Sequence, residues 1–194
     1  MSSQIERFLA VYERELATIV RNRVYGLIAL GFVLSILSLT FIGSMSGYVV
    51  VVLNLLVPLE ILVPVLCAAF GYRTLLADRE SGELDILRTY PLRGTVHIAG
   101  VLLSRFVLVV LIIIGAFVFV GVMIPVMNEG AGGQYLLRRT TYNGVLLFVR
   151  FVILTSVAAT VFLAIVTAIS AAASQSQRVV VLVVLLVFGV AIGF

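Results

Sequence analysis

The chain carries one charged stretch between two long apolar runs, Arg73-Thr-Leu-Leu-Ala-Asp78-Arg79-Glu80-Ser-Gly82-Glu83-Leu84-Asp-Ile-Leu87-Arg88-Thr-Tyr-Pro91-Leu-Arg93-Gly94. It holds eight of the 22 charged residues of the protein. A simple connector between two helices needs only a few residues, whereas this stretch is several times longer. We therefore expect residues 78–93 to form a docking surface on the aqueous side of a membrane. A solvated linker is the alternative.

Local signals predict a short helix within this stretch. Asp78 fits an N-cap, and Glu80 and Glu83 fall in the first turns, where the helix dipole favours anions. Two leucines three positions apart give the helix an apolar edge, and a proline ends it. The residues expected to contact a partner are Asp78, Arg79, Glu80, Gly82, Glu83, Leu84, Leu87, Arg88, Pro91 and Arg93.

Composition predicts that the protein lies in a lipid bilayer. Hydrophobic residues make up 62% of the chain, charged residues make up 11%, and the mean hydropathy is +1.25. Soluble domains carry about 25% charged residues. We expect an all-α integral membrane protein, a polytopic helical bundle in which residues 1–194 form a single transmembrane domain. The net charge of +4 then reflects arginines in membrane-flanking loops, so no nucleic acid is expected as a partner.

Five apolar runs predict membrane spans, at 24–43, 48–72, 98–127, 144–173 and 179–194. Between them we expect a cytoplasmic coupling loop at 73–97 and a polar loop at 128–143. The last run has 16 residues, and a span needs about 20. We therefore expect the chain to be a fragment in which the fifth span is incomplete. A short span that ends at the membrane face is the alternative.

The N-terminal segment 3–23 predicts an amphipathic helix. Ser3 and Glu6 fit a capping box, and apolar residues then recur at helical spacing. Because the segment leads directly into the first span, we favour an elbow helix that lies in the membrane interface. A helix that packs on another part of the protein is the alternative.

The distribution of arginine predicts the orientation. With the N-terminus inside, ten arginines lie on the inner side and three, Arg138, Arg139 and Arg150, lie on the outer side or near it. Short cytoplasmic loops carry the excess of basic residues. The N-terminus and the 73–97 loop are therefore expected to be cytoplasmic, in a multi-pass protein of the cell membrane.

Glu60 is the one acidic residue deep within a predicted span, between Pro58 and Pro64. A charge at the middle of a bilayer costs about 2.5–3.5 kcal/mol on insertion scales, so the side chain should face a partner or a wet cavity. One interpretation is that Glu60 lines a translocation pathway. The other is a protonated or hydrogen-bonded carboxyl that satisfies carbonyls freed by Pro64. Arg150 in the fourth run is a candidate partner.

The fourth apolar run places a small residue at every fourth position. Such a stripe allows close approach of helices and predicts a packing face within or between subunits. Its members are Ser156, Thr160, Ala164, Ala168 and Ala172.

The sequence lacks the motifs of an enzyme. It has no His-Glu-x-x-His, no Gly-x-Ser-x-Gly and no pair of aspartates in the apolar runs. Because it has no lysine, it cannot hold a nucleotide through a Gly-x-x-x-x-Gly-Lys-Ser/Thr loop. Cys67 and His97 are the only residues of their types, which argues against structural zinc. We expect no catalysis, metal or cofactor in this chain.

The order of these features resembles the permease subunits of type-2 ABC transporters. Residues 78–84 are similar to the family's Glu-Arg/Lys-x-x-Gly-Thr-Leu motif, with Glu83 in the usual Thr position, and residues 87–93 to its Leu-Leu/Arg-x-x-Pro-Leu/Ile-x-Arg motif. Gly100 fits the third-span glycine, whereas Val101 stands where a basic residue is usual, and Arg105 offers a substitute one turn later. Residues 174–178 look like the link between spans four and five. The chain is most similar to permeases grouped with multicopper-enzyme and nitrous-oxide-reductase maturation.

The resemblance implies a six-span protein and a specific assembly. Two permease copies, identical or paralogous, would bind two ABC ATPase subunits, which supply the ATP and Mg²⁺ chemistry, and residues 78–93 would couple ATP hydrolysis to export. Two other functions remain open: a membrane anchor or sensor that recruits a cytoplasmic partner through the same loop, and an intramembrane enzyme, which the missing motifs disfavour.

Overall fold

The computed structural model describes residues 4–43, 47–72, 94–128 and 138–172, together with residues 181, 182, 184, 185 and 187–189 of the C-terminal run. The elements of this described part are α1 (Gln4–Arg21), α2 (Arg23–Ile42), α3 (Tyr48–Gly71), α6 (Gly94–Asn128) and α7 (Arg138–Ala172). By length and composition, α2, α3, α6 and α7 can each cross a membrane. The expected all-α fold is thereby confirmed for the described residues, and the four candidate spans suggest a multi-pass membrane protein.

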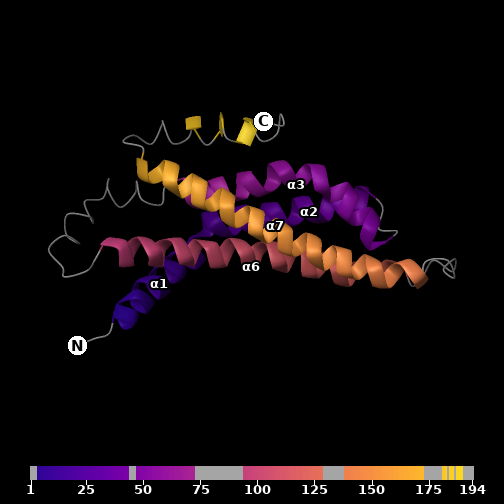
Figure 1. Cartoon of the computed structure of the whole chain (residues 1–194), viewed down its shortest axis with the longest axis horizontal. Coiled ribbons are helices and arrows are strands. Elements are labelled where there is room, and N and C mark those ends of the chain that lie inside the picture. Colours follow the sequence, from indigo (N-terminus) through magenta and orange to yellow (C-terminus); the bar gives the residue numbers. More distant parts are fainter. Residues whose placement is uncertain are drawn as a thin grey trace.

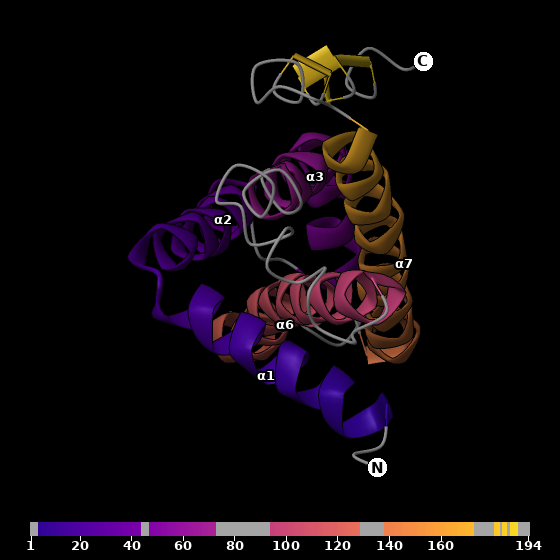
Figure 2. The same cartoon turned by 90° about the vertical axis from the view of Figure 1, so that its left-hand side faces the viewer.

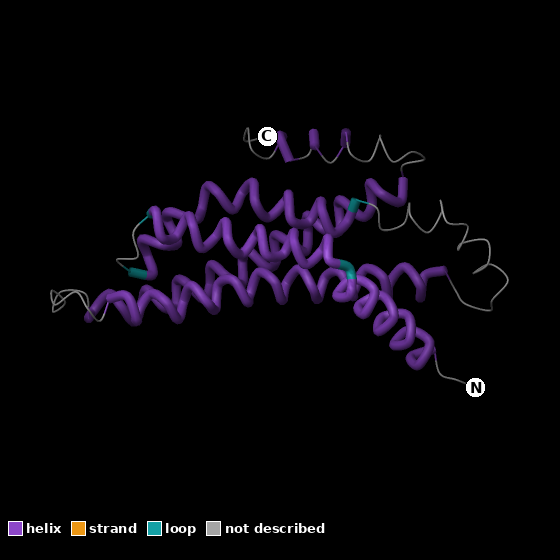
Figure 3. Tube along the Cα trace, turned by 180° about the vertical axis from the view of Figure 1, so that it is seen from behind, coloured by secondary structure: helices purple, strands orange, loops and turns teal. Residues whose placement is uncertain are grey.

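The four long helices form a bundle in which the chain runs up and down (Figures 1 and 3). At one end, the Tyr48 hydroxyl donates a hydrogen bond of 3.2 Å to the Gly121 carbonyl. At the opposite end, Arg105 donates to the Phe70 carbonyl. Helices α3 and α7 therefore run parallel to each other and antiparallel to α2 and α6. The end of α3 and the beginnings of α2 and α6 lie at one end of the bundle, together with the end of α7.

Viewed from that end, α2, α3, α7 and α6 follow one another around the bundle, and α1 lies outside α6 (Figure 2). Ile19 near the end of α1 is buried, while Leu9 and Val20 are exposed. Helix α1 packs on α6, in agreement with the alternative interpretation of the N-terminal segment as a helix that packs on another part of the protein. Its placement in a membrane interface stays a prediction, because packing on α6 and contact with lipid are compatible.

Asn22 divides the N-terminal segment from the first span. Its backbone is extended, with φ −85° and ψ 114°, and its side-chain Oδ1 accepts a hydrogen bond of 3.0 Å from the Val24 N–H. This is an N-cap, in which the side chain satisfies one of the backbone N–H groups that the first turn leaves unpaired. The sequence therefore starts a new helix here, one residue before the predicted span.

Two predicted loops end in helical backbone. Helix α6 begins at Gly94, so residues 94–97 of the predicted 73–97 loop are helical. Helix α7 begins at Arg138, so residues 138–143 of the predicted 128–143 loop are helical. Apolar composition marks only the length that fits the bilayer, whereas a helix continues into water because its hydrogen bonds are internal.

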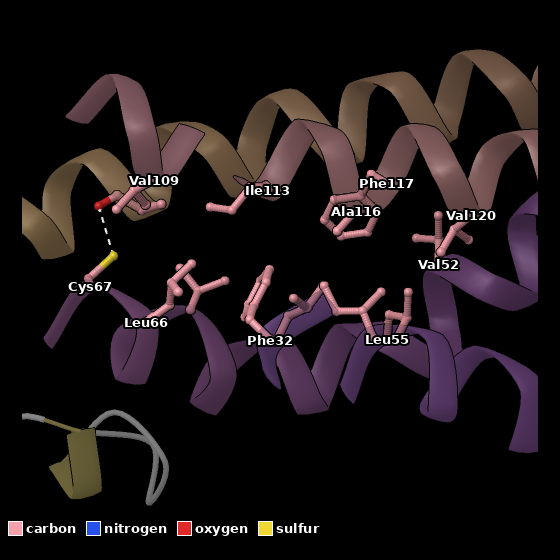
Figure 4. Packing of buried hydrophobic residues seen from close by; sticks show 14 of the residues in the cluster. Phe32, Val52, Leu55, Leu66, Cys67, Val109, Ile113, Ala116, Phe117 and Val120 are labelled. Atoms are coloured by element: carbon pink, nitrogen blue, oxygen red, sulfur yellow. Dashed lines mark hydrogen bonds between the residues drawn. The ribbon is translucent and has the colours of Figure 1, made fainter. Parts of the chain in front are cut away.

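The core joins α2 and α3 to α6 along the length of the bundle (Figure 4). Phe32 and Leu55 from one side meet Ile113 and Phe117 from the other. Phe117 also contacts Phe148 of α7 edge-on, with ring centroids 5.9 Å apart. Lipid tails are as apolar as these side chains, so this close packing, and not removal from water, holds the helices together.

The predicted fifth span, 179–194, falls only in part within the described residues. Its length and its membrane crossing stay predictions.

Candidate functional site

The residues predicted to contact an ATPase, from Asp78 to Arg93, lie outside the described residues. The structure does describe the two helices that carry them, the C-terminal end of α3 and the first turns of α6. Five residues from four helices meet around that end of α3, and we call them the α3 joint. They are Tyr25, Phe70, Gly71, Arg105 and Val166.

Arg105 of α6 is the charged member of the α3 joint. Only 8% of its surface is exposed, and its Nη1 donates a hydrogen bond to the Phe70 carbonyl. Phe70 lies in the last turn of α3, where carbonyls lack intrahelical donors and the negative end of the helix dipole favours a cation. Arg105 thus caps α3 from a neighbouring helix. Its Nε has no hydrogen-bond partner among the described residues.

Gly71 brings α3 into close contact with α7 at the same level. A Cβ atom at this position would lie 2.7 Å from Cγ1 of Val166 and 3.5 Å from Cδ1 of Leu163. Real Cβ atoms essentially never approach a neighbour that closely. The absence of a side chain is therefore what lets α7 cross the end of α3 at this distance.

Two further contacts tie the joint to the bundle. The ring of Phe70 lies 5.1 Å from that of Tyr25 on α2. One turn earlier on α3, the Cys67 thiol donates a hydrogen bond of 3.3 Å to the Ala159 carbonyl of α7 (Figure 4). The end of α3 is consequently bonded or packed to α2, α6 and α7 at once, so a force on this end acts on all three helices.

The sequence singled out Arg105 only as a substitute for a basic residue that is usual one turn earlier. In the structure Val101, which stands at the usual position, is 1% exposed, whereas Arg105 reaches Phe70. Gly71 was not identified from the sequence, because a glycine near the end of an apolar run is common and carries no signal of its partner helix.

We expect Arg105→Ala to lower the free energy of unfolding by about 1.5–3 kcal/mol, the usual contribution of a hydrogen bond to a charged group. Arg150→Ala on α7 is the matched control, because Arg150 is exposed, and it should change stability by less than about 0.5 kcal/mol. A thiol-reactive dye can follow thermal unfolding in nanodiscs, since Cys67 is the only cysteine and is fully buried. Equal melting temperatures for the two variants would contradict the capping role.

Glu60 lies on the outer surface of the bundle. It is the thirteenth of the 24 residues of α3, and its side chain is exposed. No hydrogen bond or ion pair joins it to another described residue, the candidate partner Arg150 included. Within the described chain, the carboxyl therefore does not satisfy the carbonyls near Pro64.

The predicted stripe of small residues is not the face by which α7 packs in its own chain. Ser156 and Thr160 are half-buried, and Ala164 and Ala168 are exposed. The buried face lies one position further round the helix, and it contains Thr155, Ala159, Leu163, Val166, Thr167 and Ser170. Packing of the stripe between subunits stays a prediction. Its two hydroxyls donate to carbonyls of α7 itself, each four residues back.

Among the described residues, no three His, Cys, Asp or Glu side chains gather closely enough to hold a metal ion. No protein-family model matches the chain, and no curated protein matches it either. The family resemblance therefore depends on the sequence motifs at 78–84 and 87–93 and on the order of the apolar runs.

Proposed function

We propose that this chain is the membrane-spanning permease subunit of an ATP-driven ABC exporter, with its N-terminus in the cytoplasm and six spans in the complete protein. Residues 78–93 dock on a separate ATPase subunit, which binds ATP and Mg²⁺. A second permease copy, identical or paralogous, completes the pathway. The motifs at 78–84 and 87–93 support this assignment, and the arginine distribution supports the orientation.

The observation that carries the proposal is the α3 joint. The charged stretch is attached at both ends to helices long enough to cross a bilayer, and Arg105 connects these two helices directly through the Phe70 carbonyl. A push on the stretch therefore moves α3 and α6 together and does not spread them apart. The close contact between α3 at Gly71 and α7 at Val166 means that α7 moves with them.

Such an arrangement suits alternating access. Packed helices respond to a local force by rigid-body rotation between two arrangements and not by gradual deformation. In this proposal, closure of the ATPase dimer tilts the joined helices and exposes the pathway to the other side of the membrane. A loosely held linker would absorb the same motion without moving the spans.

Co-purification tests this function. We expect the full-length protein, extracted from its native membrane in mild detergent, to bring with it an ATPase that carries a Gly-x-x-x-x-Gly-Lys-Ser/Thr loop. Recovery of a kinase or regulator with no ATPase would favour the anchor or sensor function instead. Labelling of a Ser81→Cys variant from outside intact cells by a membrane-impermeant maleimide would contradict the proposed orientation.

A further inference from the structure

The outward face of α3 combines one acid with an apolar surface. Leu53, Leu56 and Val57 lie seven, four and three positions before Glu60, so all four share one side of the helix. The three apolar side chains are 65%, 45% and 66% exposed, and Glu60 is exposed as well. We call these residues the Glu60 face.

The backbone near Glu60 lacks one hydrogen-bond donor, at Pro64, which is itself buried. Pro64 has no N–H, so the donor that an α-helix provides for the carbonyl four residues earlier, that of Glu60, is missing. The helix continues through this point. Oxygen acceptors without protein donors inside a membrane are tolerated where they face a ligand, a cavity or another chain.

The acceptors and their surroundings distinguish between classes of cation. One carboxylate beside leucine and valine offers too few oxygens to replace the water shell of a metal ion, which takes six or more ligands when it is Mg²⁺ or Ca²⁺. An organic cation whose charge is spread and shielded by apolar groups is weakly hydrated. Such a cation gains contact with the leucines while its charge is neutralised by Glu60.

We propose that the Glu60 face binds the cationic centre of a hydrophobic organic cation, with Glu60 as its counter-charge. This inference rests on the proposed function, for which it names a substrate class. The competing outcome is that a second copy of the chain packs on the Glu60 face, with the carboxyl protonated or paired across the interface.

Tetraphenylphosphonium and tetraphenylborate provide a matched pair of probes, because they have nearly the same shape and opposite charge. Equilibrium dialysis measures their binding to the full-length protein in phosphatidylcholine nanodiscs. We expect Glu60→Gln to weaken tetraphenylphosphonium binding at least tenfold and to leave tetraphenylborate binding unweakened. Glu13→Gln, at an exposed position on α1, should change either affinity by less than twofold.

Three results would overturn the proposal. The first is that the wild-type protein does not bind tetraphenylphosphonium, or that Glu60→Gln binds it equally well. The second is an equal loss of binding for both probes, which would indicate a structural effect; the Cys67 melting assay checks the fold of the variant. The third is complete disulfide formation between two copies of Leu56→Cys, which keeps Glu60, in a Cys67→Ala background, at a rate that tetraphenylphosphonium does not slow.

These results are independent of the test of the proposed function. If an ATPase co-purifies but Glu60→Gln binds the cation normally, only the substrate class is wrong. If Glu60 is required for cation binding but no ATPase co-purifies, the site exists and the transport function is wrong.

Discussion

Replacing Gly71 with leucine is expected to lower the free energy of unfolding by about 3 kcal/mol, because overpacking a closely packed site costs that much. The new side chain would begin 2.7 Å from Cγ1 of Val166, and a leucine extends further into α7. Neither helix can yield freely, since Arg105 holds the end of α3 and Leu163 packs beside Val166. The variant should therefore melt several degrees lower or fail to accumulate in the membrane.

Gly26→Leu is the matched control for this substitution. A Cβ atom at Gly26 on α2 would meet no other atom within 4 Å, so the added side chain would stand in open space outside the bundle. Gly71→Ala should give an intermediate loss. The rate at which a thiol-reactive dye reaches Cys67 on heating measures all three. If Gly71→Leu and Gly26→Leu melt together, the close approach of α3 and α7 at the joint is wrong.

Reversing both charges in Glu80→Arg/Glu83→Arg is expected to reduce transport per ATP hydrolysed at least tenfold. In the proposed function these acids face the ATPase, and like charges placed across an interface cost several kcal/mol. The α3 joint does not depend on them, so the variant should insert and melt like the wild-type protein. Proteoliposomes that contain the permease and its ATPase allow flux and hydrolysis to be measured together.

Gly82→Pro provides a second test of the same stretch without a change of charge, since a proline inside a helix costs about 3 kcal/mol. Glu13→Arg/Glu15→Arg is the control, because it reverses two charges on α1, outside the coupling stretch. Wild-type coupling in both loop variants would show that residues 78–93 are only a linker. Loss of coupling in the α1 variant as well would indicate a general effect of surface charge.

The α3 joint explains why a coupling stretch benefits from its place between these two helices. Arg105 and Gly71 act in different ways, one by a charged hydrogen bond and the other by allowing close approach. Both connect the end of α3 to helices that are distant in sequence. The proposed pathway acid, Glu60, lies on the same helix less than three turns before Phe70, so movement of the joint also moves the Glu60 face.

Much of the bundle could be predicted from the sequence, and the candidate site only in part. The apolar runs predicted α2 and α3 to within a residue or two at each end. Helices α6 and α7 begin several residues before the predicted spans 98–127 and 144–173, because hydropathy reports the bilayer and not the hydrogen bonding of the helix. For the N-cap at Asn22, the signal was present, a polar Asx residue close to the first apolar run, but Asn22 was predicted to lie inside the elbow helix 3–23.

The amino-acid sequence by itself determined that this protein is helical and that its apolar segments are long enough to cross a bilayer. The physical reason is local: in lipid each backbone must satisfy its own hydrogen bonds, and a run of about 20 apolar residues does so only as a helix. Only the tertiary structure decided which sides of those helices meet. On α7, the face that contains Ala159 and Leu163 is buried, whereas the face that contains Ala164 and Ala168 is exposed. Both faces are apolar, and they are only one residue position apart around the helix. The partner of Arg105 and the exposure of Glu60 follow from the same relative rotation, which depends on how side chains from distant segments interlock.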